Sequence, residues 1–363
     1  MSAAAPGTPT RQASVVAQIA CRVASRVCRV CLMCLMCLVG TLTTACADTP
    51  EQQAEAALLA KGLSRRGATW ELADEALLRR RLSQLERMQT ELFASHRTLP
   101  ALIQENQTHW GQLGRQVESL EKKLKSLSTN HADRPKLERQ LAQLQRTVAP
   151  PNELSRLPAL RTLAKQQLAR ELDILVKTLW CRAALSQLRE QQPQLARDPE
   201  VKRHLSQLGG ALSTLEAYRD SSDLLTKCED LVLVPHSTIY QEGGHWRLGV
   251  IVNDTVPLTV SWMPRSNDIL LASGVAATCK ARIDESRRQR QLEVEKDRVV
   301  TATPIVLTTL RFGSQAVENV PAWRLPPEAA DLGSRLGERA VDQWKVSLHP
   351  ERLQAEVRRS VLR

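Results

Sequence analysis

The chain has few bulky aromatic side chains: phenylalanine, tyrosine and tryptophan together make up only 3% of its 363 residues. Leucine, glutamine, arginine, alanine and glutamate dominate the middle instead. That mixture is typical of long helices and provides little bulky core. The length allows about two domains, and we expect the middle of the chain to be extended and helical rather than globular.

The chain also lacks the short motifs of several enzyme classes. It contains no H-E-x-x-H zinc motif, no G-x-S-x-G nucleophile elbow and no G-x-x-x-x-G-K phosphate loop. The histidines are scattered, and His236 and His245 have no thiol or carboxylate motif beside them, so we interpret both as surface or edge-strand residues. We expect no metal and no cofactor.

Cysteine is scarce outside the N-terminal segment. Six of the nine cysteines lie there: Cys21, Cys28, Cys31, Cys34, Cys37 and Cys46. Their spacing imitates a metal cluster, but an apolar run offers no partners to orient metal ligands, and a thiol is a small apolar group that suits a signal core. The remaining Cys181, Cys228 and Cys279 are odd in number, so no disulfide framework is predicted.

Residues 1–47 have the order of a signal peptide. Arginines up to Arg29 precede an uncharged apolar run, Val30 to Leu42, which is too short to span a bilayer comfortably. Ala45-Cys46-Ala47 then matches a signal-peptidase site. We therefore predict an exported protein, either periplasmic or associated with the envelope.

Lipidation is the alternative to plain cleavage after Ala47. Thr43-Thr44-Ala45-Cys46 is a loose lipobox, in which Cys46 would carry a lipid anchor and make the protein a lipoprotein. Thr43 stands where a large aliphatic residue is usual, which favours plain cleavage.

Net charge does not indicate a nucleic-acid partner. The formal charge is +11, but the basic runs are interleaved with glutamate and lack aromatic platforms for stacking on bases. We interpret these arginines as solvated helix faces.

We expect residues 48–75 to be a linker with a short extended segment, because the glycines and Trp70 within Gly62 to Leu72 favour a turn. Asp74 is placed to cap a helical coiled-coil region over residues 76–220. Leucines recur there every seven residues, and Pro100 is expected to interrupt their seam. The first seam comprises Leu78, Leu82, Leu85, Leu92, Leu99 and Ile103.

A second seam alternates spacings of four and three, resumes after a break at 128–130 and ends at Pro150-Pro151. Its members are Asn106, Trp110, Leu113, Val117, Leu120, Leu124, Leu127, Leu137, Leu141, Leu144 and Val148. Further helices run through Leu168 to Leu179 and from Asp198-Pro199. An intramolecular antiparallel bundle and an intermolecular coil both stay open, and we expect a homodimer or higher oligomer.

Valine, isoleucine and threonine dominate from about Leu231, which predicts a β-domain over residues 228–350 and a C-terminal tail over 351–363. The predicted strands are Trp246–Val252, Val256–Trp262, Val299–Phe312 and Gln343–Leu348. Asn253-Asp254 is predicted to form a tight hairpin. The charged stretch from Arg282 to Asp297 is interpreted as an exposed helix or loop insert. The fold class expected overall is α+β.

The order of features in the β-domain resembles the retropepsin-like aspartic proteases of bacterial envelopes that carry an N-terminal coiled-coil extension. Glu242 to Val250 is similar to the opening strand of that family, and Leu310 to Val320 to the strand, glycine turn and strand after its flap. Leu332-Gly333 and Leu336-Gly337 resemble its later hydrophobic-glycine motif, from which Asp331 departs. The resemblance implies a small all-β retropepsin-like barrel.

The family's catalytic Asp-Thr/Ser-Gly loop is degenerate here. The register of the flanking strands places Trp262 at the aspartate, Met263 at the threonine and Pro264 at the glycine, followed by Arg265 and Ser266. Two carboxylates sharing a proton are needed to activate water. Asp268 is a weak substitute, because Ile269-Leu270-Leu271 follows it without the small residues that let such a loop turn.

The degenerate loop at 262–266 favours a pseudoprotease that binds a protein or extended peptide, or acts as a scaffold. The alternative is an active aspartic endopeptidase with an unconventional loop. Asp254, Asp284 and Asp297 have weaker claims than Asp268, since they fall in predicted turns or in the charged insert.

Overall fold

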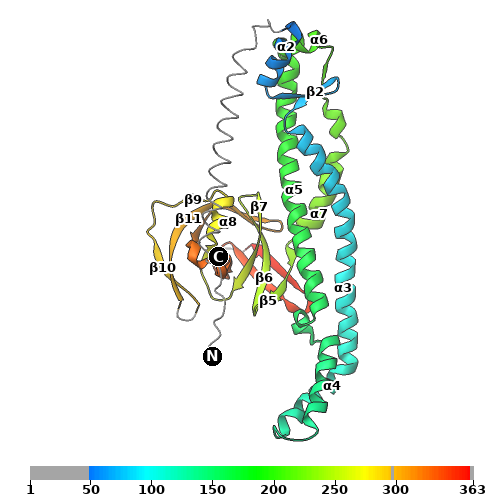
Figure 1. Ribbon diagram of the computed structural model, residues 1–363, viewed down its shortest axis with the longest axis vertical. Coiled ribbons are helices and arrows are strands. Elements are labelled where there is room, and N and C mark those ends of the chain that lie inside the picture. Colours follow the sequence, from blue (N-terminus) through cyan, green and yellow to red (C-terminus); the bar gives the residue numbers. More distant parts are fainter. Residues whose placement is uncertain (1–48, 296–297, 360–363) are drawn as a thin grey trace, which may run out of the picture. The chain divides into compact units, whose positions relative to one another are not determined.

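The computed structural model describes residues 49–295 and 298–359 (Figure 1). The described chain mixes helix and sheet and divides into two compact units. Residues 49–70 with 198–212 form the smaller unit, and residues 71–197 with 213–359 form the larger one. Residues 1–48, which include the predicted signal segment and Cys46, lie outside the described residues.

A helix opens the smaller unit where a linker was expected. α2 (Pro50–Ala60) begins at a capping box, in which the Thr49 hydroxyl accepts from the Gln52 amide and the Gln52 side chain accepts from the Thr49 amide. The linker prediction is wrong for this segment, because a cap followed by alanine, glutamine and leucine favours a helix.

The remaining elements of the smaller unit follow the sequence patterns. β1 (Leu63–Arg66) and β2 (Thr69–Leu72) form the predicted turn and extended piece, and β3 (Ala211–Leu212) pairs in parallel with β2. α6 (Pro199–Gln207) starts as predicted, since the Asp198 carboxylate accepts from two amides of its first turn.

Three helices of the larger unit share one apolar core. These are α3 (Glu75–Ser126), α5 (Pro158–Arg197) and α7 (Ser221–Val232). α3 and α5 lie side by side (Figure 1). They are antiparallel, because Arg81 of α3 contacts Trp180 of α5 while Ser95 of α3 contacts Gln167. All members of the first leucine seam are buried in this core. That seam therefore packs within the chain rather than against a second chain.

α3 continues through Pro100, so the expected interruption there is wrong. Proline removes one helical hydrogen bond. Its neighbours Leu99 and Ile103 are buried in the core that α3 shares with α5. Tertiary packing, which supplies most helical stability in proteins, holds the helix on both sides of the proline.

The far end of α3 is covered on one side only. α4 (Arg134–Thr147) folds back against it but contains no buried residue. The leucines of the second seam are half-buried at Leu113, Leu120, Leu137, Leu141 and Leu144. η1 (Pro151–Arg156) then leads into α5.

Six strands of the larger unit close into a barrel, in the order β11, β12, β8, β13, β7, β6 and back to β11. Their bounds are β6 (His245–Val252), β7 (Val256–Met263), β8 (Ile269–Leu271), β11 (Arg298–Phe312), β12 (Gln315–Arg324) and β13 (Arg335–Gly337). β8 pairs in parallel with β12, and β7 with β13, while the other neighbours are antiparallel. Apolar side chains fill the interior.

The predicted hairpin helps to close the barrel. Asn253 and Asp254 adopt φ angles of 51° and 53°, the left-handed geometry of a tight β-hairpin turn. The Asn253 side chain accepts from the Thr309 amide at 3.3 Å and donates to the Cys279 carbonyl at 2.7 Å. The turn is therefore tied to β11, beside the point where β11 pairs with β6.

The described part of the charged stretch, residues 282–295, contains strands and is not a helix or loop insert. β9 (Arg282–Ile283) and β10 (Arg290–Glu295) both pair with β11. The alternation of Leu292 and Val294, each 6% exposed, marks one buried face of β10. Charged residues between them hide this period of two in the sequence.

The expected C-terminal tail contains a strand. β15 (Gln354–Arg359) lies between β14 (Trp344–His349) and β4 (His236–Thr238) in a separate three-stranded sheet, and its Ala355 and Val357 are buried. The remaining elements are β5 (Tyr240–Glu242), α8 (Ser273–Thr278), η2 (Leu215–Tyr218), η3 (Pro327–Leu332) and η4 (Pro350–Arg352). No helix in the described ranges is long and apolar enough to cross a membrane.

Candidate functional site

The loop singled out by its degenerate motif follows the end of β7. Trp262 is 6% exposed and belongs to the barrel core, whereas Pro264 and Arg265 are exposed. Arg265 has a φ of 65°, and the chain turns sharply at this residue. The amide of Ser266 donates to the Met263 carbonyl at 3.4 Å and closes this turn.

Each carboxyl near this loop has its own donor. Asp268 Oδ1 accepts from the Trp323 indole nitrogen at 3.0 Å, and Glu338 Oε2 accepts from the Arg265 amide at 3.1 Å. Between residues 49 and 359, apart from 296–297, no hydrogen bond joins Asp268 to a second carboxyl. An indole N–H can only donate a hydrogen bond, so Asp268 is the acceptor in this contact.

The other predicted acids lie apart from this loop. Asp254 accepts from Arg311 Nε at 3.2 Å, and Asp284 accepts from the amide and hydroxyl of Ser286 in its own turn. Asp297 lies outside the described residues. His245 is exposed at the start of β6.

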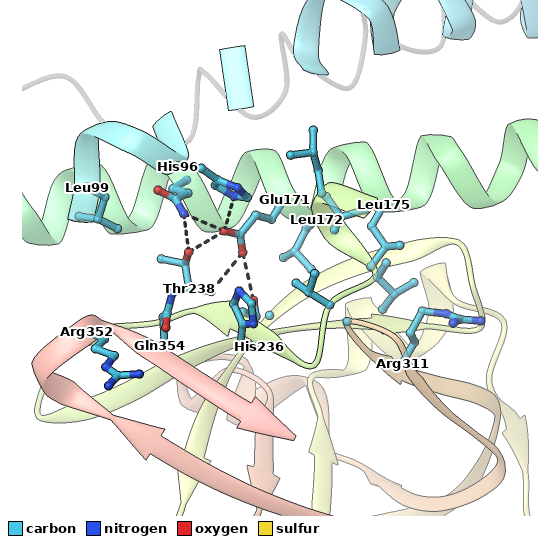
Figure 2. Close-up of a pocket in the computed structure, with 18 of the residues that line it drawn as sticks. His96, Leu99, Glu171, Leu172, Leu175, His236, Thr238, Arg311, Arg352 and Gln354 are labelled. Carbon is cyan, nitrogen blue, oxygen red and sulfur yellow. Dashed lines mark hydrogen bonds and ion pairs between the residues drawn. The ribbon is translucent and has the colours of Figure 1, made fainter. Parts of the chain in front are cut away.

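A second site lies where the helices meet the β-strands of the larger unit. A cavity of about 150 Å³ is lined from α3, α5, the end of α7, β4, β6, β11 and the C-terminal strand (Figure 2). Leucines of α3 and α5 lie on one side, and His236, Arg311, Arg352 and Gln354 come from the β-strands and their connections (Figure 2). His236 thus lines a cavity as well as being exposed at a strand end.

Two glycines allow these layers to come close. A Cβ at Gly249 of β6 would lie 2.6 Å from Leu168 Cδ1 and 3.0 Å from Leu172 Cδ2, so a larger residue there would force these leucine side chains of α5 to shift. Gly313 has a φ of 52°, and a Cβ there would collide with the Val234 carbonyl oxygen. Both glycines line the cavity.

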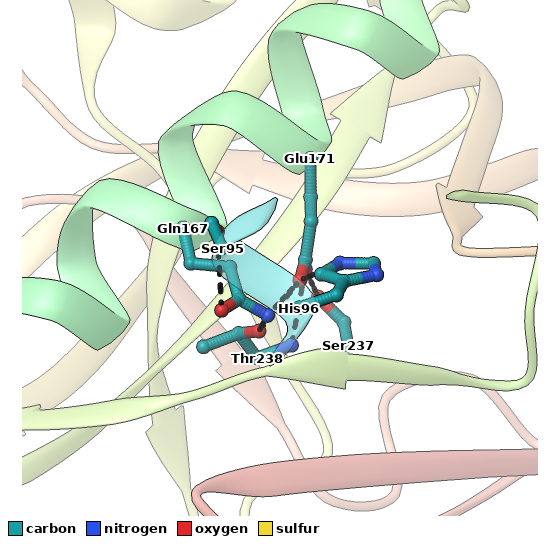
Figure 3. A network of polar contacts seen from close by, with 6 residues as sticks. All are labelled: Ser95, His96, Gln167, Glu171, Ser237 and Thr238. Atoms are coloured by element: carbon teal, nitrogen blue, oxygen red, sulfur yellow. Dashed lines mark hydrogen bonds and ion pairs between the residues drawn. The ribbon is translucent and has the colours of Figure 1, made fainter. Parts of the chain in front are cut away.

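Glu171 of α5 is the centre of a polar network at the cavity wall (Figure 3). Its Oε1 accepts from Thr238 Oγ1 at 2.6 Å and Gln167 Nε2 at 3.0 Å, and it lies 3.3 Å from His96 Nε2. Its Oε2 accepts from the Thr238 amide at 3.1 Å and the Ser237 hydroxyl at 3.2 Å. One carboxylate therefore ties α3, α5 and β4 together.

Hydrogen bonding controls the ionisation of this carboxyl. Burial raises the pKa of Glu171, but hydrogen bonds from His96, Thr238 and Gln167 together outweigh it and hold the pKa below its usual value. The Glu171 side chain is 13% exposed and stays ionised near neutral pH because its donors replace water.

The network does not have the geometry of a nucleophilic triad. A triad needs a histidine between the carboxylate and the hydroxyl. Here the Ser237 and Thr238 hydroxyls donate directly to Glu171, and His96 contacts the same carboxylate from α3. The hydroxyls are therefore held as donors, and the arrangement positions structural elements rather than activating a nucleophile.

Neither site is built to hold a metal ion. In the described part of the chain, no group of three or more histidine, cysteine, aspartate or glutamate side chains is placed to ligate one.

Sequence reasoning identified the loop after β7 but missed the cavity and its network. Glu171 and Gln167 lie on a helix whose leucines dominated the interpretation, and His96 lies some 75 residues before Glu171. Ser237 and Thr238 follow Pro235-His236, a short polar stretch without a motif. No local signal in the sequence brings these segments together.

Comparison with known proteins adds little to this geometry. No family model and no curated protein sequence matches the chain. Among solved structures, the chain is similar to a retropepsin-like aspartic protease from Rickettsia conorii, with 16% identity over 33% of this chain and 86% of that chain. The TM-score is 0.25. A score this low supports no conclusion about activity. The barrel is defined by its strand pairing alone.

Proposed function

We propose that the protein is a non-catalytic envelope protein whose barrel is a retropepsin-like pseudoprotease that binds a protein or extended peptide. The observation that carries this proposal is the loop after β7. In the register that the resemblance implies, Trp262, Met263 and Pro264 stand where the family's catalytic motif would be, and Asp268 accepts a hydrogen bond from the Trp323 indole. Aspartic catalysis requires two carboxyls that share one proton.

A free sheet edge supports binding of an extended segment. β10 ends the order of strands on one side of the barrel sheet, and in the described ranges it pairs only with β11. An exposed edge presents unpaired amides and carbonyls to which a peptide can add as a further strand. The proposal therefore retains peptide recognition without cleavage.

Peptide-library assays on the purified full chain, from acid to neutral pH, test both parts of the proposal. We expect extended peptides to bind and to be recovered uncut. Peptides N-methylated at alternate residues, which lack the donors needed for strand addition, are expected to lose binding.

The competing function is an active aspartic endopeptidase with an unconventional loop. It predicts acid-dependent cleavage that Asp268→Asn abolishes while thermal unfolding is unchanged, and that result would overturn the proposal. A Trp262→Asp, Met263→Thr, Pro264→Gly variant is a useful comparison only if it folds, because Trp262 lies in the barrel core.

Export and self-association complete the proposal. The N-terminal segment supports a periplasmic or envelope-associated location, with Cys46 as the site of a lipid anchor if cleavage precedes it. Mass spectrometry of the mature N-terminus distinguishes Asp48 from lipidated Cys46. Assembly into a homodimer or higher oligomer is proposed for the helical region.

A further inference from the structure

The cavity between the helices and the β-strands has a wall that is apolar over a large part. Its apolar lining consists of Leu99, Pro100, Leu172, Leu175, Leu231, Val232, Val234 and Ile251. Its volume of about 150 Å³ equals that of a cavity which accommodates a benzene molecule. A ligand body of roughly six carbons therefore fits this space.

The carboxylate at the wall and two of the basic side chains are engaged with partners in the chain. Glu171 has five polar contacts, one of them with His96. Arg311 donates to Asp254 at 3.2 Å. None of these three side chains therefore needs a charged ligand as a counter-ion.

The other two basic side chains at the wall also lie beside carboxylates. Arg352 is 71% exposed and lies 4.0 Å from Glu351. His236 stands opposite Glu356 in the pairing of β4 with β15 and interacts with it electrostatically. A charged ligand would lose hydration on entering the cavity and would find its counter-ions already taken, which is unfavourable.

A neutral amide is the polar side chain of the wall that stays available. Gln167, Ser237 and Thr238 are all bonded to Glu171. Gln354 stands opposite Thr238 in the pairing of β15 with β4, so both side chains project from the same face of the sheet.

The Gln354 side chain therefore lines the cavity beside the Thr238 hydroxyl (Figure 2). Within residues 49–295 and 298–359, no hydrogen bond satisfies this amide. An amide side chain both donates and accepts, as a hydroxyl group does. A ligand hydroxyl therefore suits Gln354 without bringing a charge into the cavity.

We propose that this cavity binds a small neutral alcohol with an apolar body of roughly six carbons. The body lies among Leu172, Leu175 and Ile251, and the hydroxyl bonds to the Gln354 amide. The site lies outside the loop after β7 and does not depend on the proposed pseudoprotease function.

Calorimetric titration of the full chain with three probes tests the ligand chemistry. Hexan-1-ol carries a neutral hydroxyl, whereas hexanoate and hexylammonium carry a negative and a positive charge on chains of the same carbon number. We expect hexan-1-ol to bind saturably, and about tenfold or more tightly than either ion, because each ion would lose hydration without a free counter-ion. Absence of hexan-1-ol binding, or equal or tighter binding of either ion, would overturn the proposal.

A pair of variants tests the location of the hydroxyl. Gln354→Leu is expected to weaken the binding of hexan-1-ol by about threefold to tenfold, as the loss of one neutral hydrogen bond predicts. Gln343→Leu, at an exposed position just before β14, is the matched control and keeps the affinity of the wild type. Equal affinity of the Gln354→Leu variant and the wild type would overturn the assignment of the hydroxyl to this amide.

Methyl NMR of the wild-type protein locates the apolar body and does not depend on the folding of any variant. Hexan-1-ol is expected to shift the methyl signals of Leu172, Leu175 and Ile251. Shifts confined to other methyl groups would overturn the proposal, because the ligand would then lie elsewhere.

Discussion

At the scale of single residues, the absence of a Cβ at Gly313 allows the chain to pass close to the Val234 backbone. Gly313→Ala places a Cβ against the Val234 carbonyl oxygen, a backbone atom that cannot rotate away, and forces alanine to a φ of 52°. The left-handed conformation alone costs about 1–2 kcal/mol for an L-residue. We expect a loss of about 3 kcal/mol or more in the free energy of unfolding, measured by urea denaturation.

Gly274→Ala is the matched control. Gly274 lies in α8 with nothing within 4 Å of its Cβ position and no positive φ. Alanine favours a helix by up to about 1 kcal/mol over glycine, so this variant should be as stable as the wild type or slightly more stable. Equal destabilisation by both substitutions would contradict the steric explanation.

Buried thiols make a second prediction for single residues. Burial raises the pKa of Cys181 to about 12 and that of Cys228 to about 11, and it also raises the pKa of Cys279. The thiolate is the reactive form. We expect all three to resist iodoacetamide in the native protein at pH 8 and to react in denaturant, as read by peptide mass spectrometry. Rapid native labelling of Cys181 or Cys228 would show that the helical core opens, and rapid labelling of Cys279 that the barrel core opens.

At the scale of elements, Glu171 holds α3, α5 and β4 together through its ionised form. Because the pKa of Glu171 is lowered in the folded state, its stabilisation is complete above the ordinary glutamate range near pH 4.5 and is lost as pH falls through that range toward the folded pKa. Glu171→Gln should therefore destabilise the protein by about 2 kcal/mol at pH 7. The NH₂ group of the glutamine side chain is a donor, and it would face groups of Ser237 or Thr238 that donate as well. The difference from wild type should shrink in acid.

Glu190→Gln, an exposed position on the same helix, is the control for this substitution. Its unfolding midpoint is expected to follow that of the wild type across pH. A Glu171→Gln variant whose deficit is constant from pH 7 to pH 3 would mean that shape rather than charge determines the contribution of this side chain.

At the scale of the whole molecule, self-association is proposed to use the leucines that α3 and α4 leave partly exposed. Leu120 and Leu144 are half-buried in the single chain, and a second copy would cover them. We expect Leu120→Lys with Leu144→Lys to reduce the mass measured by light scattering from that of an oligomer to that of one chain, with little change in thermal stability. A wild-type protein that is already monomeric, or a variant that stays oligomeric, would contradict the proposed coil-mediated assembly.

Local patterns in the sequence determined the types of many elements. The heptad leucines of α3, the Asp198-Pro199 start of α6 and the Asn253-Asp254 turn were all predicted, because each depends on neighbours within a few residues. Predictions failed where tertiary packing overrode local signals. Pro100 continues a helix because Leu99 and Ile103 are buried beside it, and β10 is a strand because β11 pairs with it.

The sequence by itself therefore determined the helical stripes and the β-rich C-terminal region. Only the tertiary structure decided that the first leucine seam packs within the chain and that β6 meets β11 to close the barrel. It also brought Glu171 to His96 and Thr238, and His236 to the wall of a cavity. The physical reason is that these contacts join residues about 60 or more positions apart, whose proximity depends on how whole helices and strands pack and not on any local spacing.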